Sequence, residues 1–99
     1  RIEKKDIHAA LPIAPWEAAL GATVKIPVPD GWVEVRIPEN SQSGRKLRLK
    51  GRGIPATPPG DLYLILEVVL PPATTQKARE FYQTMAQELA FNPRQHLGV

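Results

Sequence analysis

The density of proline and glycine constrains this chain more than any other feature of its sequence. Eleven prolines and seven glycines stand among 99 residues, so uninterrupted stretches are short. Proline removes a backbone donor, and glycine weakens the interior of helices and strands alike. The pattern predicts a mainly β fold in which short strands alternate with turns, rather than a helical bundle. At this length we expect one domain, which buries about two-thirds of its unfolded surface in one modest core.

The alternation of apolar and polar residues locates the expected strands. We expect them at residues 6–11, 22–28, 32–37 and 45–50. Residues 61–70, DLYLILEVVL, are apolar on both faces and predict a central strand. After the double proline that ends this strand, Thr74 or Thr75 can cap a helix that runs to about Ala90.

The segment LPIAPWEAALGA, residues 11–22, predicts a compact helix at 15–20 between two strands. Pro15 suits the first helical turn, because its missing N–H would have no partner there. Gly21 is a natural helix terminator. These residues alone leave two interpretations open: an active-site turn at the head of a helix, or a corner that joins two strands.

The sequence offers little material for catalysis. Cysteine is absent, which excludes disulfides, thiolate nucleophiles and cysteine zinc sites. His8 and His96 lie far apart in the sequence with no third ligand nearby, and Ser41 and Ser43 have no histidine partner. The glycines at 51 and 53 lack the spacing of a phosphate-binding loop, so we expect them to supply unusual backbone angles at a turn. We therefore predict no enzyme activity, no catalytic residue, no metal and no cofactor.

Basic residues are concentrated in one segment. The net charge is +3, and five of the thirteen basic residues fall within eight positions that contain no acid: Arg45, Lys46, Arg48, Lys50 and Arg52. Lys46, Arg48 and Lys50 share one face of an expected strand, about 7 Å apart. That spacing suits contacts with phosphates, which would bind nucleic acid without reading its sequence. A solvated strand face also carries such charges, and we favour this second interpretation.

The expected last helix carries a broad apolar stripe. Its members recur at spacings of three and four: Ala78, Phe81, Tyr82, Met85, Ala86 and Leu89. Such a stripe can close over the sheet of its own domain, or it can pair with a second copy of the chain. The sequence does not decide between the two.

The sequence contains no apolar run of the roughly 20 residues that span a bilayer, so we expect no membrane partner. The absence of cysteine fits a cytoplasmic location. The charged start RIEKKD suggests a domain cut from something longer.

The order of motifs is nevertheless specific. LPIAPWEAALGA, a D-G turn, IPENSQSGRKLRLKGRGIP and GDLY follow one another between residues 6 and 70. This order resembles the second C-terminal domain of DnaJ-type co-chaperones. FNPR after the last helix resembles the curved-DNA-binding subtype of that family.

The resemblance implies a small β-sandwich of short antiparallel strands with a short corner helix and a C-terminal helix. Residues 1–73 would form the sandwich, and residues 74–99 would form the dimerisation helix and tail of the same domain. LPIAPWEAALGA would then be the structural corner, with Trp16 packed into the core. Spacing and family pattern together predict the dimer interface: Phe81, Tyr82, Met85 and Leu89.

The resemblance also implies partners. These are a second copy of the chain, unfolded client proteins through accessory contacts, and DNA at the basic segment, which would bring nucleoid association. The His-Pro-Asp tripeptide of the J domain is missing, because His8 precedes alanine and His96 precedes leucine. We therefore expect the heat-shock chaperone ATPase to be engaged only through a J domain of the full protein. The cysteine-rich zinc module of some relatives is absent as well.

Overall fold

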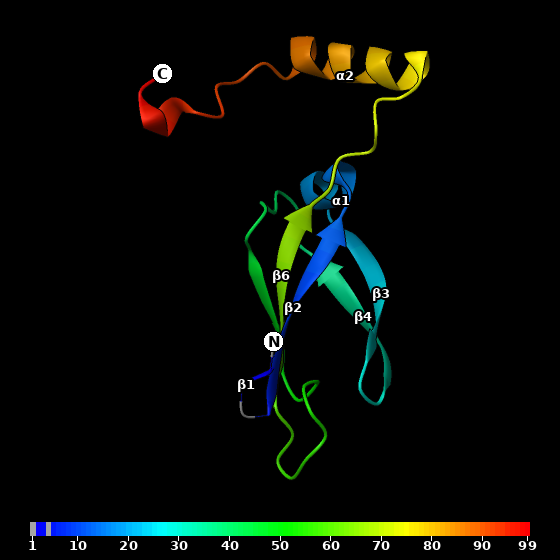
Figure 1. The fold of residues 1–99 in the computed structure, drawn as a ribbon, viewed down its shortest axis with the longest axis vertical. Helices are drawn as coiled ribbons and strands as arrows, with labels where there is room; N and C mark the ends of the chain where they lie inside the picture. The colour runs from blue at the N-terminus through cyan, green and yellow to red at the C-terminus, as the bar shows by residue number, and fades with distance from the viewer. Residues whose placement is uncertain (1, 4) are drawn as a thin grey trace.

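The computed structural model describes the backbone of residues 2–3 and all of residues 5–99, so Arg1 and Lys4 of the RIEKKD segment lie outside the described residues. The molecule measures 53 × 33 × 21 Å. Figure 1 shows why it is long: two packed sheets form its body, helix α1 (Pro15–Leu20) closes one end, and helix α2 (Gln76–Glu88) lies beyond that end. The short 3-10 helix η1 (Gln95–Leu97) follows in the tail.

The mainly β prediction is confirmed, with strands close to the expected positions. The larger sheet has the order β1-β2-β6-β5, and its strands are β1 (Ile2–Glu3), β2 (Asp6–Ile13), β6 (Leu62–Val68) and β5 (Lys46–Leu49). The smaller sheet is a hairpin of β3 (Ala22–Val28) and β4 (Gly31–Ile37). The central position of β6, between β2 and β5, confirms the prediction for DLYLILEVVL.

One strand pairing differs from the expected antiparallel arrangement. Strands β2 and β6 pair in parallel, from Ile7 opposite Leu62 to Ile13 opposite Val68. Residues 14–61, which include the smaller sheet, form the connection that lets the chain return to run in the same direction. Alternation shows which face of a strand is buried, but it contains no information about strand direction.

Strand β2 continues through Pro12, although the sequence predicted its end at Leu11. The Ile7 N–H donates to Asp61 O at 2.9 Å, and Ile13 O accepts from the Val69 N–H at 2.8 Å. Odd-numbered residues of β2 therefore bond to β6, and the nitrogen of Pro12 faces the opposite edge. In the described part of the chain, strand β1 pairs there only with Asp6 and Ile7, so the missing N–H of Pro12 interrupts no ladder.

The core lies between the two sheets and under α1. Four elements contribute its buried residues: Leu11 and Ile13 from β2, Ala18 from α1, Val35 and Ile37 from β4, and Leu62, Leu64 and Leu66 from β6. Leu47 and Leu49 of β5 are only half-buried, because β5 is the edge of the larger sheet.

Helix α1 is a structural corner between β2 and β3. The Ala14 N–H donates to Glu17 Oε1 at 2.8 Å at the start of the helix. At its end, the Asn40 N–H donates to Ala19 O and the Ser41 N–H donates to Ala18 O. Because six residues cannot satisfy their own terminal carbonyls, the loop after β4 completes the helix.

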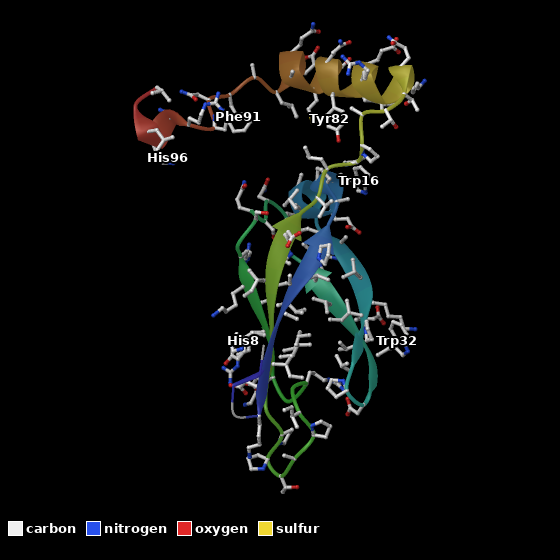
Figure 2. The ribbon with its side chains drawn as sticks, in the orientation of Figure 1. His8, Trp16, Trp32, Tyr82, Phe91 and His96 are labelled. Atoms are coloured by element: carbon white, nitrogen blue, oxygen red, sulfur yellow. The ribbon has the colours of Figure 1, made fainter. Side chains whose placement is uncertain are left out.

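The expectation that Trp16 packs into the core is wrong. Its side chain is 58% exposed, and the residue of α1 that enters the core is Ala18. Two positions along a helix correspond to about 200° of rotation, so a buried Ala18 places Trp16 on the outer side. Trp16 faces the gap between α1 and α2 (Figure 2).

The two glycines of the loop after β5 have different roles. Gly51 has a φ of +75°, which is the unusual backbone angle that the sequence predicted. Gly53 is required for space instead, because a Cβ there would lie 2.5 Å from Asp61 O and 2.7 Å from Lys5 O.

Candidate functional site

Helix α2 begins where the sequence predicted. The Ala78 N–H donates to the Thr75 side-chain oxygen at 3.0 Å, so Thr75 rather than Thr74 is the N-cap. The helix ends at Glu88, and the Leu89 N–H closes the last turn on Met85 O. Leu89 is therefore the C-cap, and the last helical residue is two residues short of the expected end near Ala90.

Helix α2 covers neither sheet. None of its residues is buried, and it lies beyond α1 at the end of a short linker, residues 69–75 (Figure 1). Among the predicted interface residues, Phe81 is 67%, Met85 41% and Leu89 64% exposed. The sequence left two possibilities open for the apolar stripe: packing onto the sheet of its own domain, or pairing with a second copy. In the structure the stripe does not pack onto either sheet.

Tyr82 fixes α2 to the linker. Its hydroxyl donates to Pro71 O at 2.7 Å, and the side chain is half-buried as a result. Figure 2 shows Tyr82 pointing from α2 toward the linker, on the side where α1 and Trp16 lie. The hydrogen bond places the apolar stripe opposite the outer side of α1.

An apolar groove of about 560 Å³ separates the two helices. Four residues of α1, one of the linker and four of α2 line it: Pro15, Trp16, Ala19, Leu20, Pro71, Ala78, Phe81, Tyr82 and Met85. The structure thus brings three predicted interface residues together in one groove. Leu89, a turn farther along, does not line it.

The sequence did not identify the contribution of α1 to this groove. Trp16 and Leu20 are spaced by four residues and share one face of the helix, opposite to small Ala18. This arrangement around the helix was the feature of the sequence that could have placed Trp16 and Leu20 on the outer side of α1. The large size of tryptophan favoured the core instead, but the residue of α1 that is buried is Ala18.

The basic segment forms one edge of the larger sheet and the turn that follows it. All five predicted residues are exposed: Arg45, Lys46, Arg48, Lys50 and Arg52. Strand β5 contains only Lys46 and Arg48 of this set. The face is therefore accessible, although its strand is shorter than expected.

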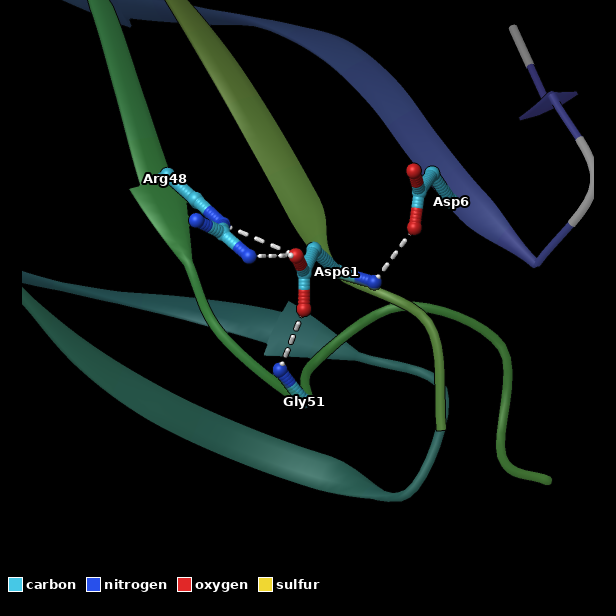
Figure 3. Close-up of polar contacts among 4 residues, drawn as sticks. All are labelled: Asp6, Arg48, Gly51 and Asp61. Atoms are coloured by element: carbon cyan, nitrogen blue, oxygen red, sulfur yellow. Dashed lines mark hydrogen bonds and ion pairs between the residues drawn. The ribbon is translucent and has the colours of Figure 1, made fainter. Parts of the chain in front are cut away.

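Arg48 is already paired within the chain. Its guanidinium lies 2.6 Å and 2.8 Å from Asp61 Oδ2 through two nitrogens, as Figure 3 shows. The other oxygen of Asp61 accepts the Gly51 N–H at 2.9 Å, and the Asp61 N–H donates to Asp6 Oδ1 at 2.7 Å. The Gly51 N–H, followed by Arg48, holds the pKa of Asp61 below its ordinary value, and Asp61 raises the pKa of Arg48. This network fixes the turn after β5.

Lys46 lies beside an aromatic pair on the outer face of the same sheet. Its Nζ is 5.5 Å from the centre of the Tyr63 ring, and His8 stacks on Tyr63 with 4.8 Å between ring centres. His8 is half-buried rather than an exposed strand residue, because the neighbouring strand places Tyr63 opposite it.

The other polar candidates have structural contacts or lie apart. The Ser41 hydroxyl donates to Pro38 O, and Ser43 Oγ accepts the Val68 N–H. His96 is in the tail, far from His8 (Figure 2). Within residues 2–3 and 5–99, no three histidine, cysteine or acidic side chains gather as metal ligands. The helices of this described part are all too short and polar to cross a membrane.

Comparison with known proteins places these features in a family. The family model described as the DnaJ C terminal domain matches residues 1–71. A protein named Curved DNA-binding protein from Coxiella burnetii is 47% identical over 97% of this chain. Proteins of the same name from Pseudomonas putida and Salmonella newport are 44% and 41% identical over 94% and 98% of it.

The chain spans about a third of the length of these relatives, 31% for the Coxiella burnetii protein. Their similarity extends beyond the family model, through α2 and the tail. Both comparisons agree with the order of motifs in the sequence and with the fold: the chain belongs to the family of DnaJ C-terminal domains.

Proposed function

We propose that this chain is a non-enzymatic module that joins two copies of a DnaJ-type co-chaperone into a homodimer and adds accessory contacts to unfolded client protein. The observation that carries this proposal is the position of α2, whose apolar stripe lies clear of both sheets. Exposed side chains as large as Phe81 and Met85, four residues apart on one helix face, are typical of an interface. On this proposal, the heat-shock chaperone ATPase is engaged by a J domain outside the present sequence.

Dimerisation would matter because individual contacts with an unfolded chain are weak. Two client-binding arms held on one dimer convert the second contact into an intramolecular event. Overall affinity then rises by about 10²–10⁴ without any new type of contact, provided that both arms reach the same client.

The dimer is tested by placing charge on the stripe. We expect the double variant Phe81→Asp, Met85→Asp to be a folded monomer, because each charge would have to be buried without a partner. Sedimentation equilibrium over a wide concentration range measures the mass, and far-ultraviolet circular dichroism checks the fold. A matched control, Gln83→Asp with Gln87→Asp, places the same charges at the same spacing on the opposite face of α2. A wild-type chain that stays monomeric, or a Phe81/Met85 variant that still dimerises, would contradict the proposal.

Accessory client binding is tested with the same variants. We expect the dimer to delay the aggregation of a reduced, unfolded protein at lower chain concentration than the monomeric variant does, because avidity is lost in the monomer. Light scattering measures the delay. Equal protection by the two forms would show that dimerisation adds nothing to client contacts.

We propose DNA binding as a second candidate, favoured by the name of the relatives, Curved DNA-binding protein, and by the exposed basic segment. Because Arg48 is paired with Asp61, the lysines on either side of it are the better phosphate contacts. The double variant Lys46→Glu, Lys50→Glu leaves the Arg48–Asp61 pair intact.

Fluorescence anisotropy with a short DNA duplex at several salt concentrations tests this candidate. We expect wild-type affinity to fall steeply with salt, and the lysine variant to lower the slope of log K against log salt by about 2. The control is Lys25→Glu with Arg36→Glu, exposed positions on the smaller sheet. Salt-independent binding, or equal loss in both variants, would count against the basic segment.

A further inference from the structure

Strand β5 leaves one edge of the larger sheet without a neighbouring strand. Among residues 2–3 and 5–99, β5 pairs with β6 alone and is the outermost strand of its sheet (Figure 1). We propose that this edge binds an extended segment of unfolded client, in which acidic and apolar residues alternate, by adding that segment to the sheet as a further strand. The inference rests on the proposed accessory client contacts, and it names where they are made and which segments they favour.

The backbone groups along this edge are oriented for such an addition. Just before β5, the Leu66 N–H donates to Arg45 O at 2.8 Å, and the register then continues without a break to the end of β5. Because the residues that bond across an antiparallel ladder alternate, every second residue from Arg45 onward bonds to β6. The N–H and C=O groups of Lys46 and Arg48 therefore face away from β6. Strand β5 contains no proline, so both outward donors are present.

The side chains of β5 offer two different faces to an added strand. Lys46 and Arg48 lie exposed on the outer face, whereas Leu47 and Leu49 pack against the core on the inner face and stay half-buried. A strand beside β5 would cover the open side of both leucines with its own inner-face residues, so apolar residues are favoured at these positions. Its outer-face residues would lie beside the two cations, where carboxylates are favoured. The edge therefore selects an alternation of apolar and acidic residues.

The charge of this edge is largely uncompensated within the chain. Asp61 pairs with Arg48, but the other four residues of the basic segment form no ion pair with any residue that the structure describes. The Nζ of Lys46 lies 5.5 Å from the centre of the Tyr63 ring, which keeps this cation on the outer face beside the edge. A segment that carries carboxylates would supply the missing partners.

The same charges disfavour a second copy of the chain at this edge. Lysine on a short edge strand commonly prevents pairing between like strands. If β5 strands of two copies paired, basic side chains would lie beside basic side chains, which is destabilising. The edge can thus remain open in the presence of other copies and still accept a strand of opposite charge.

Two substitutions of Lys46 separate backbone pairing from charge. Lys46→Pro removes the outward N–H together with the charge, and it leaves the ladder to β6 whole because that N–H does not bond to β6. Lys46→Gln, the matched control, removes the charge alone. The probe is a fluorescein-labelled peptide of six residues in which valine and glutamate alternate, and fluorescence anisotropy measures its dissociation constant. We expect Lys46→Pro to raise this constant at least about tenfold and Lys46→Gln about threefold. Far-ultraviolet circular dichroism checks that both variants are folded.

N-methylation of the peptide provides a second test, which leaves the protein unchanged. In antiparallel pairing the glutamates lie opposite Lys46 and Arg48, and their N–H groups face β5. We expect a peptide methylated at its glutamate nitrogens to bind at least about tenfold more weakly, and one methylated at its valine nitrogens to lose less than about twofold. A peptide in which valine alternates with lysine should also lose at least about tenfold, because its charge is reversed.

Several outcomes would overturn strand addition. Equal effects of the two Lys46 variants would show that charge alone attracts the peptide, and equal effects of the two methylation patterns would show that its backbone does not pair. A DNA duplex that displaces the peptide, with both Lys46 variants weakening both ligands alike, would assign the edge to nucleic acid and overturn the inference.

The aggregation assay separates this inference from the client function on which it rests. If Lys46→Pro loses the peptide but delays aggregation as well as the wild type does, clients bind elsewhere, so the accessory function stands and the inference is overturned. If the wild-type chain binds the peptide with the expected dependence on methylation but does not delay aggregation, the strand-binding edge is supported and the proposed client function fails.

Discussion

The side chain of Asp61 connects several parts of the larger sheet. Its two oxygens bind the Arg48 guanidinium and the Gly51 N–H, while its own N–H donates to Asp6. The side chain of Asp61 is 15% exposed and that of Arg48 58%, so water screens the ion pair in part. The hydrogen bond to the backbone of Gly51 is the larger cause of the lowered pKa of Asp61. Strand β5, β6 and the turn between them are joined at this point.

Asp61→Asn is predicted to lower the melting temperature at neutral pH. Because the folded-state pKa of Asp61 lies below the ordinary value of 3.8, its stabilising effect is complete above that value and is lost as pH falls through the folded-state pKa. The difference between wild type and variant should thus be constant from pH 7 to pH 5 and shrink below pH 4. Thermal unfolding followed by circular dichroism at pH 7, 5 and 3 measures it. The control Asp30→Asn makes the same substitution at an exposed turn. A difference as large at pH 3 as at pH 7 would contradict the prediction.

The burial of Trp16 could not be predicted from the type of this residue alone. Its size and apolar character favour burial in general, and only the phase of α1 relative to Ala18 placed it outside. Arg48 is similar: its position on an exposed strand face was predictable, whereas its partner Asp61, thirteen residues away, was not. Contacts between distant segments depend on strand register, which alternation does not specify.

At the scale of elements, the residues within a strand or helix were sufficient to predict where that element lies in the sequence. Alternation located β2 to β6 within about two residues but did not predict β1, and Thr75 and Pro15 marked the starts of the two α-helices. The parallel pairing of β2 with β6 and the position of α2 away from the sheets are different. Both depend on how distant parts of the chain meet, so the sequence left the fate of the α2 stripe open.

Thr75→Ala is predicted to destabilise α2 by about 1 kcal/mol, because the N–H of Ala78 loses its capping oxygen. Since no residue of α2 is buried, the loss should be confined to the helix. Amide hydrogen exchange measures it: exchange in the first turns of α2 should quicken about fivefold, with the core strands unchanged. Thr74→Ala is the matched control, one residue outside the cap. Equal effects of the two substitutions would show that the cap is unimportant.

At the scale of the whole molecule, the chain is more extended than its length requires. Its radius of gyration is 17.0 Å, whereas a compact domain of this length has about 12.6 Å. The excess comes from α2 and the tail, which lie beyond α1 (Figure 1). All core residues lie between Leu11 and Leu66, so the sandwich is complete without the last 26 residues, 74–99.

A chain that ends at Ala73 is therefore predicted to fold. Its melting temperature should lie within a few degrees of that of the monomeric Phe81→Asp, Met85→Asp variant, which is the appropriate comparison because neither gains stability from dimerisation. Small-angle scattering should give a radius of gyration of about 11–12 Å for the shortened chain. A melting temperature lower by 10 °C or more would show that α2 supports the core.

The position of Pro12 has a consequence for self-association of the sheets. Beyond Ile7, one edge of β2 has no neighbouring strand among residues 2–3 and 5–99, and such an edge is a template onto which any extended polypeptide can add by backbone pairing. Pro12 withholds a donor midway along this edge. Growth of the sheet by successive strand addition is thereby opposed at that point, at no cost to the parallel ladder on the other side of β2.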